Sequence, residues 1–261
     1  MIELNIDGVK VMAPEGARLL DAARDAGFRV PSLCHHPAVE PEGACRLCVV
    51  ELRGAGEEHS RVVPSCLEVA RAGMTVATAS EDVLSVRRTV LELLLQRSPA
   101  SPVLRALAAQ AGMETAAGPL GDAHGCILCG LCTRVCAAAG FHAISTLGRG
   151  AEARVGGPGG QPPQDCVGCA ACAHVCPTGH IALEESGSRR GIWGRDFELL
   201  PCAECGVPTI PREQAERAAS SLGFPSADLA RCPACNRKAT AVTFGRIVAL
   251  SSTDAREGVK R

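Results

Sequence analysis

Sixteen cysteines are the residues of this sequence with the most chemistry in them. Thiolates bind iron and zinc, whereas disulfides persist only in oxidising compartments. The N-terminus, MIELNIDG, lacks the basic region, apolar stretch and cleavage site of a signal peptide. The longest apolar stretch, within Val83 to Leu95, is interrupted by polar and charged residues and is too short for a membrane span. We therefore expect a soluble, cytoplasmic protein whose cysteines are metal ligands.

Eight of the cysteines form two runs of identical spacing, C-x2-C-x2-C-x3-C, forty residues apart. Bacterial two-cluster ferredoxins bind 4Fe-4S clusters with this run, and its fourth cysteine ligates the other cluster. The spacing predicts one cluster on Cys126, Cys129, Cys132 and Cys176, and a second on Cys166, Cys169, Cys172 and Cys136. Small residues let the backbone pass close to the inorganic sulfurs, at Gly130, Gly168, Ala170 and Ala171. A pair of zinc knuckles is the disfavoured alternative, because zinc sites typically pair two C-x2-C units. One departure from the usual run is Ala137 after Cys136, where a proline is expected.

The four N-terminal cysteines are spread more widely, at Cys34, Cys45, Cys48 and Cys66. This spacing is too open for a zinc ribbon and differs from that of plant-type ferredoxins. Three ligands from one loop and a distant fourth suit a 2Fe-2S cluster. His35 and His36 raise a Rieske alternative, but four thiolates are already available, so we interpret them as ordinary loop residues. The isolated histidines 59, 124, 142, 174 and 180 are expected to be solvated or to pack.

The last four cysteines form two C-x2-C pairs, Cys202 with Cys205 and Cys232 with Cys235. Two such pairs fit tetrahedral coordination of one ion by four thiolates. Structural zinc is the preferred interpretation, because a closed site would stabilise a segment with little apolar core. Rubredoxin-like iron is the rival, although the intervening stretch lacks aromatic residues and has a helical pattern between Pro211 and Gly223.

Local patterns predict the elements that must position the first cysteine group. Ile2 to Ile6 and Val9 to Met12 read as strands joined by Asp7-Gly8, a dipeptide that favours a two-residue turn. A helix with apolar residues from Leu19 to Ala26 ends at Gly27. Further strands are expected at Cys48 to Leu52 and Thr75 to Thr78. These elements predict a small mixed sheet with one helix.

The remaining chain is expected to be helical before the repeated runs and irregular between them. Ser80 is a candidate N-cap for a helix that extends to Arg97, and residues 103–112 form a second short helix. Gly148 to Pro163 is rich in glycine and proline and is expected to be a loop. Twenty-eight glycines and 2% aromatic residues argue for several small modules rather than one large core. The predicted domains are residues 1–80, a helical linker 81–120, a two-cluster domain 121–190 and a metal-binding tail 195–245.

Residues 30–52, VPSLCHHPAVEPEGACRLCVVEL, and residues 64–80, PSCLEVARAGMTVATAS, resemble a known family. They are similar to the N-terminal domain shared by the large iron-sulfur subunit of respiratory complex I, the diaphorase subunits of NAD-linked hydrogenases and the iron-only hydrogenases. The resemblance implies a β-grasp domain with a 2Fe-2S cluster on Cys34, Cys45, Cys48 and Cys66. It extends to about residue 185. The resemblance fails after the Ser80 helix, where the family usually has a 4Fe-4S site of one His and three Cys. Residues 97–125 contain one histidine, His124, and no cysteine.

The predicted fold is thus α+β: a β-grasp 2Fe-2S ferredoxin domain, a helical linker, a two-cluster 4Fe-4S ferredoxin domain and a small zinc-ribbon-like tail. Thiolate-held clusters transfer single electrons, and no nucleotide-binding loop, P-loop or nucleophile elbow occurs in the sequence. We expect no catalytic residues of the chain's own. The predicted role is electron transfer inside a cytoplasmic complex, between a flavoprotein that oxidises NAD(P)H and a hydrogenase or formate dehydrogenase-type subunit.

Two alternatives remain open from sequence, a redox-responsive regulatory or adaptor protein and a lone electron carrier. The formal net charge of −1 and the dispersed charges give no reason to expect a nucleic acid or an anionic membrane as partner.

Overall fold

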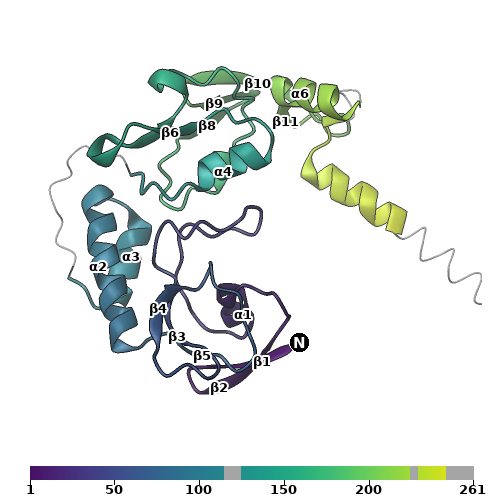
Figure 1. Ribbon diagram of the computed structural model, residues 1–261. Helices are drawn as coiled ribbons and strands as arrows, with labels where there is room; N and C mark the ends of the chain where they lie inside the picture. The colour runs from purple at the N-terminus through teal and green to yellow at the C-terminus, as the bar shows by residue number, and fades with distance from the viewer. Residues whose placement is uncertain (115–124, 224–228, 245–261) are drawn as a thin grey trace, which may run out of the picture. The chain divides into compact units, whose positions relative to one another are not determined.

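The computed structural model describes residues 1–114, 125–223 and 229–244 (Figure 1). The chain divides into two compact units. The first comprises Met1–Asp165 and Ala171–Ala182, and the second comprises Cys166–Ala170 and the chain from Leu183 onward. Parts of the predicted linker, two-cluster domain and tail, together with His124, lie outside the described residues. No helix in the described ranges combines the length and the apolar character needed to span a bilayer.

The first unit begins with a five-stranded mixed sheet in the order β2-β1-β5-β3-β4 (Figure 1). Its strands are β1 (Ile2–Ile6), β2 (Val9–Ala13), β3 (Val49–Arg53), β4 (Arg61–Pro64) and β5 (Thr75–Ala77). β1 pairs parallel with β5, and the other pairings are antiparallel. Helix α1 (Leu19–Asp25) buries Leu19 and Leu20 in a core that includes Leu4, Ile6 and Leu52. This arrangement fits the predicted β-grasp, and β4 is the strand that sequence reasoning missed.

The turn between β1 and β2 has the predicted form. Ile6 pairs with Val9, which leaves Asp7 and Gly8 as a two-residue loop, with φ of 47° and 84°. Both values are in the left-handed region that a type I′ turn requires. The Asp7 carboxylate also accepts hydrogen bonds from the backbone N and Oγ1 of Thr78, at 2.7 and 2.5 Å. The turn is therefore anchored to the residue that follows β5.

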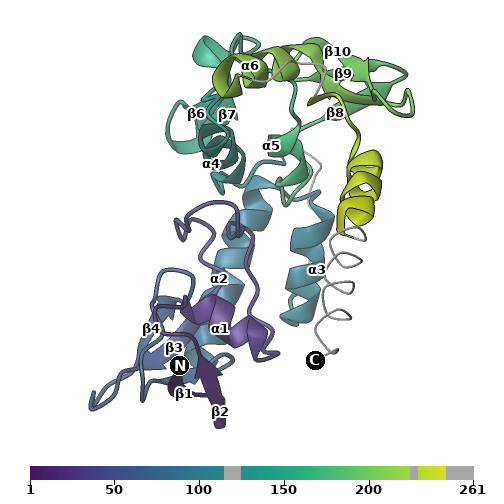
Figure 2. The same cartoon turned by 90° about the vertical axis from the view of Figure 1, so that its right-hand side faces the viewer.

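Two helices follow the sheet, α2 (Glu81–Arg97) and α3 (Pro102–Gln110), and they lie side by side in Figures 1 and 2. Ser80 is the N-cap of α2, as predicted, and its Oγ accepts from the Val83 backbone N at 3.4 Å. The residues that α2 buries are Val83, Arg87 and Leu91, one stripe at i, i+4 spacing. An arginine therefore occupies the middle of the core-facing stripe.

The remainder of the first unit carries short elements around the repeated cysteine runs. They are α4 (Leu131–Ala138), β6 (Ser145–Leu147), β7 (Arg154–Gly156) and α5 (Ala171–His174), with single 3₁₀ turns at Gly150–Glu152 and Pro158–Gly160. Helices α4 and α5 pack together (Figure 2). The prediction of a plain loop from Gly148 to Pro163 was wrong in part, because β7 pairs with β6 through Val155 and Thr146. A three-residue strand is too short to produce a periodic pattern.

The second unit is built on a four-stranded antiparallel sheet in the order β11-β10-β9-β8. Its strands are β8 (Leu183–Ser186), β9 (Arg189–Ile192), β10 (Arg195–Pro201) and β11 (Pro208–Pro211). Phe197 on β10 is fully buried. Helix α6 (Arg212–Leu222) begins after Pro211 and ends at Gly223, whose φ of 72° suits a C-cap glycine, as the sequence indicates. A further helix covers residues 233–244.

Candidate metal centres

The N-terminal cysteine group converges from one loop and two strand ends. Cys34 and Cys45 lie on the loop between α1 and β3, Cys48 directly precedes β3, and Cys66 follows β4. All four are at most 4% exposed. The backbone N of Leu33 donates to Cys45 Sγ and that of Cys45 donates to Cys34 Sγ, both at 3.3 Å. Amide donors directed at sulfur are what a thiolate-ligated cluster needs around it.

The thiols of this group interact in pairs. A hydrogen bond from Cys34 lowers the pKa of Cys45 to about 6, and one from Cys66 lowers the pKa of Cys48 to about 7. The same two hydrogen bonds raise the pKa of Cys34 and of Cys66. Four buried sulfurs that face one another, two of which ionise readily, fit a group that requires thiolate ligands.

The two histidines beside Cys34 are engaged elsewhere. His35 Nε2 lies 3.5 Å from Asp21 Oδ1 on α1, and burial lowers the His35 pKa. His36 Nδ1 accepts from the backbone N of Ala38 at 3.2 Å. These contacts match the interpretation of both as loop residues and lend no support to the Rieske alternative.

Arg87, the buried residue of α2, contacts the same region and was missed from sequence. Its Nε donates to Leu47 O at 3.1 Å and its Nη2 donates to Val49 O at 2.7 Å. The guanidinium thus binds the carbonyls on both sides of Cys48, and desolvation by burial lowers its pKa. The signal was available, because a lone arginine on an apolar helical stripe needs buried acceptors.

The first cysteine run forms a small cavity with the last cysteine of the second run. Cys126, Cys129, Cys132 and Cys176 all line it, which is the crossed set that the spacing predicts. Burial raises the pKa of Cys129 to about 11 and that of Cys132 to about 12. Unionised thiols avoid the cost of burying charge, so bound cations are needed to hold these sulfurs as thiolates.

Two further side chains on this cavity were not expected there. His180, predicted to be isolated, lines it together with Thr178. Thr178 Oγ1 lies 3.7 Å from Cys176 Sγ. Both follow Cys176 within the CPTGH stretch, so proximity to a ligand cysteine was the signal.

Arg97, the last residue of α2, holds the start of the first run. Its Nε donates to Cys126 O at 2.9 Å, and its Nη2 donates to Ala153 O. Arg97 therefore joins Ala153, which lies in the predicted loop after Gly148, to Cys126 at the start of the first run.

The other four cysteines of the repeat are divided between the two units. Cys136 and Cys172 lie on α4 and α5, and Cys136 Sγ accepts from the backbone N of Ala143 at 3.3 Å. Cys166 and Cys169 belong to the second unit. Their assignment to one cluster with Cys136 and Cys172 stays a prediction.

Within the second unit, the Cys166–Ala170 segment is held by β9 and β10. Arg195 Nη1 donates to Cys166 O at 2.7 Å, and Arg190 Nη1 donates to Gly168 O at 2.9 Å. Gly168 has a φ of 69°, and a Cβ there would lie 2.5 Å from Cγ of Phe197. The sequence interpretation that this glycine lies beside a cluster stays a prediction; in the structure, a side chain at this position would meet the Phe197 ring.

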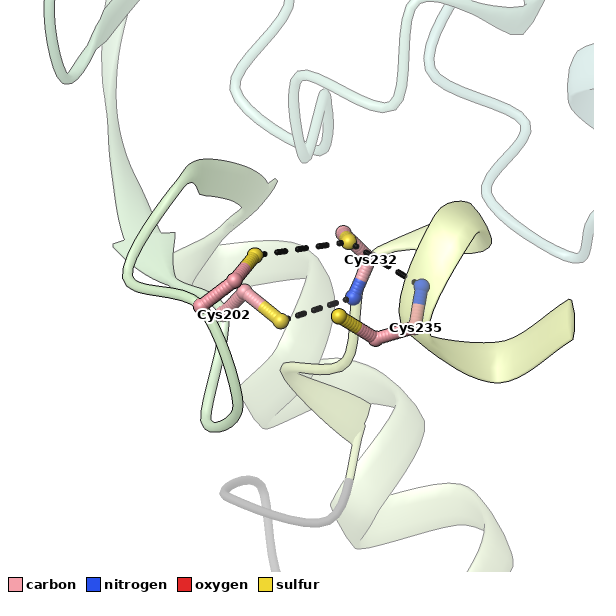
Figure 3. A group of neighbouring side chains, drawn as sticks. Cys202, Cys232 and Cys235 are labelled. Carbon is pink, nitrogen blue, oxygen red and sulfur yellow. Dashed lines mark hydrogen bonds between the residues drawn. The ribbon is translucent and has the colours of Figure 1, made fainter. Parts of the chain in front are cut away.

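The C-terminal cysteine group lies wholly in the second unit. Cys202 and Cys205 occupy the connection between β10 and β11, where Gly206 has a φ of 75°. Cys232 precedes the helix of residues 233–244 and Cys235 lies on it; Figure 3 shows both facing Cys202. The Cys232 backbone N donates to Cys202 Sγ at 3.3 Å, the main reason that the Cys202 pKa falls to about 6. A hydrogen bond with Cys232 raises the pKa of Cys235 to about 12.

The spacing of these four sulfurs suits a single ion. All four Sγ atoms lie within 4.8 Å of one another, and the Cys205–Cys232 distance is 3.8 Å. Zinc–sulfur bonds of about 2.3 Å in a tetrahedron place neighbouring sulfurs about 3.8 Å apart. In the described ranges, no other group of three or more His, Cys, Asp or Glu side chains is arranged to hold a single metal ion.

Comparison with protein families assigns the two kinds of cysteine site to known domains. Residues 1–81 match the family described as a 2Fe-2S iron-sulfur cluster binding domain. Residues 125–180 match the family described as a 4Fe-4S dicluster domain. The fold and the sites therefore define an iron–sulfur protein with a 2Fe-2S domain followed by a two-cluster 4Fe-4S domain.

Similar proteins place this combination in redox enzymes. The chain is 29% identical over 79% of its length to the NADPH-Fe(3+) oxidoreductase subunit alpha of Geobacter sulfurreducens, and covers 27% of that protein. It is 30% identical over 71% of its length to the NADP-reducing hydrogenase subunit HndD of Solidesulfovibrio fructosivorans, and covers 36% of it. The chain thus spans about a third or less of these curated relatives.

One solved structure is similar to this chain over most of its own length. A chain of an NAD⁺-reducing [NiFe]-hydrogenase in the H₂-reduced state superimposes with a TM-score of 0.58 and 32% identity, over 68% of this chain and 85% of that one. The protein belongs to the same family as that hydrogenase chain. Names of oxidoreductase and hydrogenase subunits support electron transfer and not the regulatory alternative.

Proposed function

We propose that this chain transfers single electrons between a flavoprotein that oxidises NAD(P)H and a second catalytic subunit of hydrogenase or formate dehydrogenase type, within a cytoplasmic complex. One observation carries the proposal. Cys34 and Cys45 of the first group share a hydrophobic cluster with Cys129 of the first run, through Leu33, Leu47 and Leu131. The loops of two candidate cofactor sites are therefore in contact inside one compact unit. Electron transfer from one cluster to the next requires such proximity.

The proposed ligands are those that the spacing indicates. They are Cys34, Cys45, Cys48 and Cys66 for a 2Fe-2S cluster; Cys126, Cys129, Cys132 and Cys176 for one 4Fe-4S cluster; and Cys166, Cys169, Cys172 and Cys136 for another. Clusters of these types, when bound, accept and release one electron at a time. In the first group, the chain's own residues bury all four sulfurs, donate amide hydrogen bonds to two of them and place the buried Arg87 beside the ligand loop. Four thiolate ligands per cluster leave no open position for a substrate, so we propose no catalytic residue here.

The boundaries 1–80, 81–120, 121–190 and 195–245 remain our proposal for the domains. The family matches at residues 1–81 and 125–180 support the first and the third.

Anaerobic purification of the full chain tests the cofactor content. We expect about ten irons per chain and, after reduction, EPR signals of both cluster types. A preparation with far fewer irons, or with one signal type only, contradicts the proposal.

Affinity purification of the tagged chain from its native host tests the partners. We expect a flavin-containing polypeptide in stoichiometric amount, because the similar proteins are subunits of NAD(P)-linked enzymes. Recovery of the chain alone contradicts the proposed complex.

We propose further that Cys202, Cys205, Cys232 and Cys235 bind one structural zinc ion. The 3.8 Å sulfur separation supports a mononuclear site. The protein also joins the two halves of the site directly, because Ala203 N donates to Ala230 O at 2.9 Å and Arg231 pairs with Glu204 at 2.9 Å. A closed site at this junction would fasten residues 233–244 to the sheet.

Replacement of all four tail cysteines by serine distinguishes the possible metals. We expect the full chain to lose about one zinc while its iron content stays unchanged. Loss of about one iron instead identifies a rubredoxin-like site, and loss of about four identifies a further cluster. Arg231→Gln is the matched control, since it removes the Glu204 contact but no ligand, and it should retain zinc.

A further inference from the structure

Arg134 is the side chain that joins the loops of two different candidate clusters. It lies on α4 between Cys132 and Cys136, and its side chain is 12% exposed. Its Nη2 donates to Cys34 O at 2.8 Å and to Cys129 O at 3.2 Å. Cys34 belongs to the proposed 2Fe-2S site and Cys129 to the first proposed 4Fe-4S site. A single guanidinium nitrogen thus binds one ligand residue from each.

The charge of Arg134 is only partly compensated at this position. Nη1 donates to a third neutral acceptor, Glu40 O, at 2.6 Å. Nε lies 3.2 Å from Glu42 Oε2, but the geometry does not make a hydrogen bond, and the Glu42 side chain is 55% exposed. Solvent screens such a carboxylate more strongly than it screens a buried cation. The guanidinium therefore contributes a positive potential at both ligand loops.

The other arginines in the first unit that contact ligand loops serve one site each. Arg87 binds the carbonyls that flank Cys48, and Arg97 binds Cys126 O. They provide internal comparisons, because removal of either charge should affect one cluster type only.

We propose that Arg134 is a positioning residue that sets the reduction potentials of both the 2Fe-2S cluster and the first 4Fe-4S cluster, and that fixes the two ligand loops relative to each other. The inference rests on the proposed function. Reduction adds one negative charge to a cluster, and a nearby buried cation stabilises the reduced form of each. The planar guanidinium can bind several carbonyls at once, whereas a lysine ammonium supplies charge without that fixed geometry.

EPR-monitored redox titration of the full, cluster-loaded chain tests the proposal. In Arg134→Gln we expect the equilibrium constant for one-electron reduction to fall about tenfold at both clusters, a decrease of about 59 mV in each potential. The remaining 4Fe-4S cluster, to whose proposed ligands Arg134 donates no hydrogen bond, should show a smaller shift. Arg134→Lys keeps the charge, so both potentials should stay close to the wild-type values, while the magnetic interaction between the two reduced clusters weakens.

Two control variants make the result specific. Arg97→Gln should lower the potential of the 4Fe-4S cluster alone, because Arg97 contacts no residue of the 2Fe-2S loop among its hydrogen-bond partners. Arg88→Gln removes the same charge from the exposed side of α2 and should change neither potential. The proposal is overturned if Arg134→Gln leaves either potential unchanged, or if Arg134→Lys shifts both potentials as much as Arg134→Gln does.

A second substitution covers the case in which Arg134→Gln does not retain its clusters. Glu42→Gln removes the carboxylate beside Nε from an exposed side chain, so both potentials should rise. Glu40→Gln is its control, because that side chain is 93% exposed and only its backbone contacts Arg134. Unchanged potentials in Glu42→Gln overturn the proposal.

Iron content and EPR of the wild-type chain are measured first. A wild type that lacks either cluster type contradicts the proposed function. If the wild type holds all its clusters but substitution of Arg134 changes neither potential, only this inference is contradicted.

Discussion

At the scale of single residues, arginine side chains hydrogen-bond to the backbone of the cysteine-bearing loops. Arg87, Arg97, Arg134, Arg190 and Arg195 each donate to a carbonyl beside or on a ligand-loop residue. Carbonyls in irregular loops have no strand partner, and an unpaired buried carbonyl is costly. The forked, permanently charged guanidinium satisfies these acceptors and places positive charge beside thiolates.

Gly168→Ala should disrupt the Cys166–Ala170 segment. The new Cβ would lie 2.5 Å from Phe197 Cγ, and the ring cannot move easily because it is fully buried. The left-handed backbone adds about 1–2 kcal/mol of strain. We expect the purified variant to lose about four irons per chain, measured by metal analysis.

Gly187→Ala provides the matched control for this substitution. Gly187 has a φ of 57° and open space around its Cβ position. It therefore carries similar backbone strain without the clash. Equal iron loss in both variants would show that strain, and not contact with Phe197, is responsible.

At the scale of elements, the turn between β1 and β2 is hydrogen-bonded to Thr78, the residue that follows the neighbouring strand β5. Asp7→Ala removes a carboxylate that accepts two hydrogen bonds from Thr78 and a residue that tolerates a positive φ. We expect the free energy of unfolding to fall by about 1–2 kcal/mol, measured by denaturant titration. Asp7→Asn keeps one acceptor and the turn preference, so it should be milder; equal losses would argue against the Thr78 contact.

The elements that the sequence predicts correctly are those specified by nearby residues. Asp7-Gly8 specifies its turn, Ser80 caps α2, and Gly223 ends α6. Strands β4 and β7 were missed because they are four and three residues long and depend on partners elsewhere in the chain. The four-stranded sheet of the second unit was also missed; its strands β8, β9 and β11 have four residues each, and β10 has seven.

The candidate sites were predictable to different degrees. Cysteine spacing predicts all four groups, because ligand geometry restricts spacing along the chain. The assignment of Cys136, Cys166, Cys169 and Cys172 to one cluster stays a prediction. Arg87, Arg97 and Arg134 were not found, because their acceptors lie on segments far away in sequence; Arg134 and Cys34 are separated by 100 residues. The cysteines within each run lie close together in sequence, whereas the arginines that contact their loops come from distant segments.

At the scale of the whole molecule, the crossed arrangement predicts how cysteine substitutions combine. Cys126 and Cys176 line the same cavity although they belong to different runs. Cys126→Ser combined with Cys176→Ser should therefore lose no more iron than either single variant, about four per chain. Cys126→Ser combined with Cys166→Ser should lose about eight, because two clusters are affected.

Metal analysis and EPR on these four variants check the prediction. If the Cys126 and Cys176 losses instead add, each run holds its own cluster, and the crossed assignment is wrong.

The proposed crossed ligand set has a consequence for the order in which the site can be assembled during synthesis of the chain. Translation produces Cys126, Cys129 and Cys132 well before Cys176, so a nascent chain that has just exposed the first run on the ribosome cannot complete that site. With the proposed ligand set, iron and sulfide can complete this site only after the second run has left the exit tunnel. A premature stop codon between the two runs would leave a product without the fourth cysteine of this site, even though the whole first run had been translated.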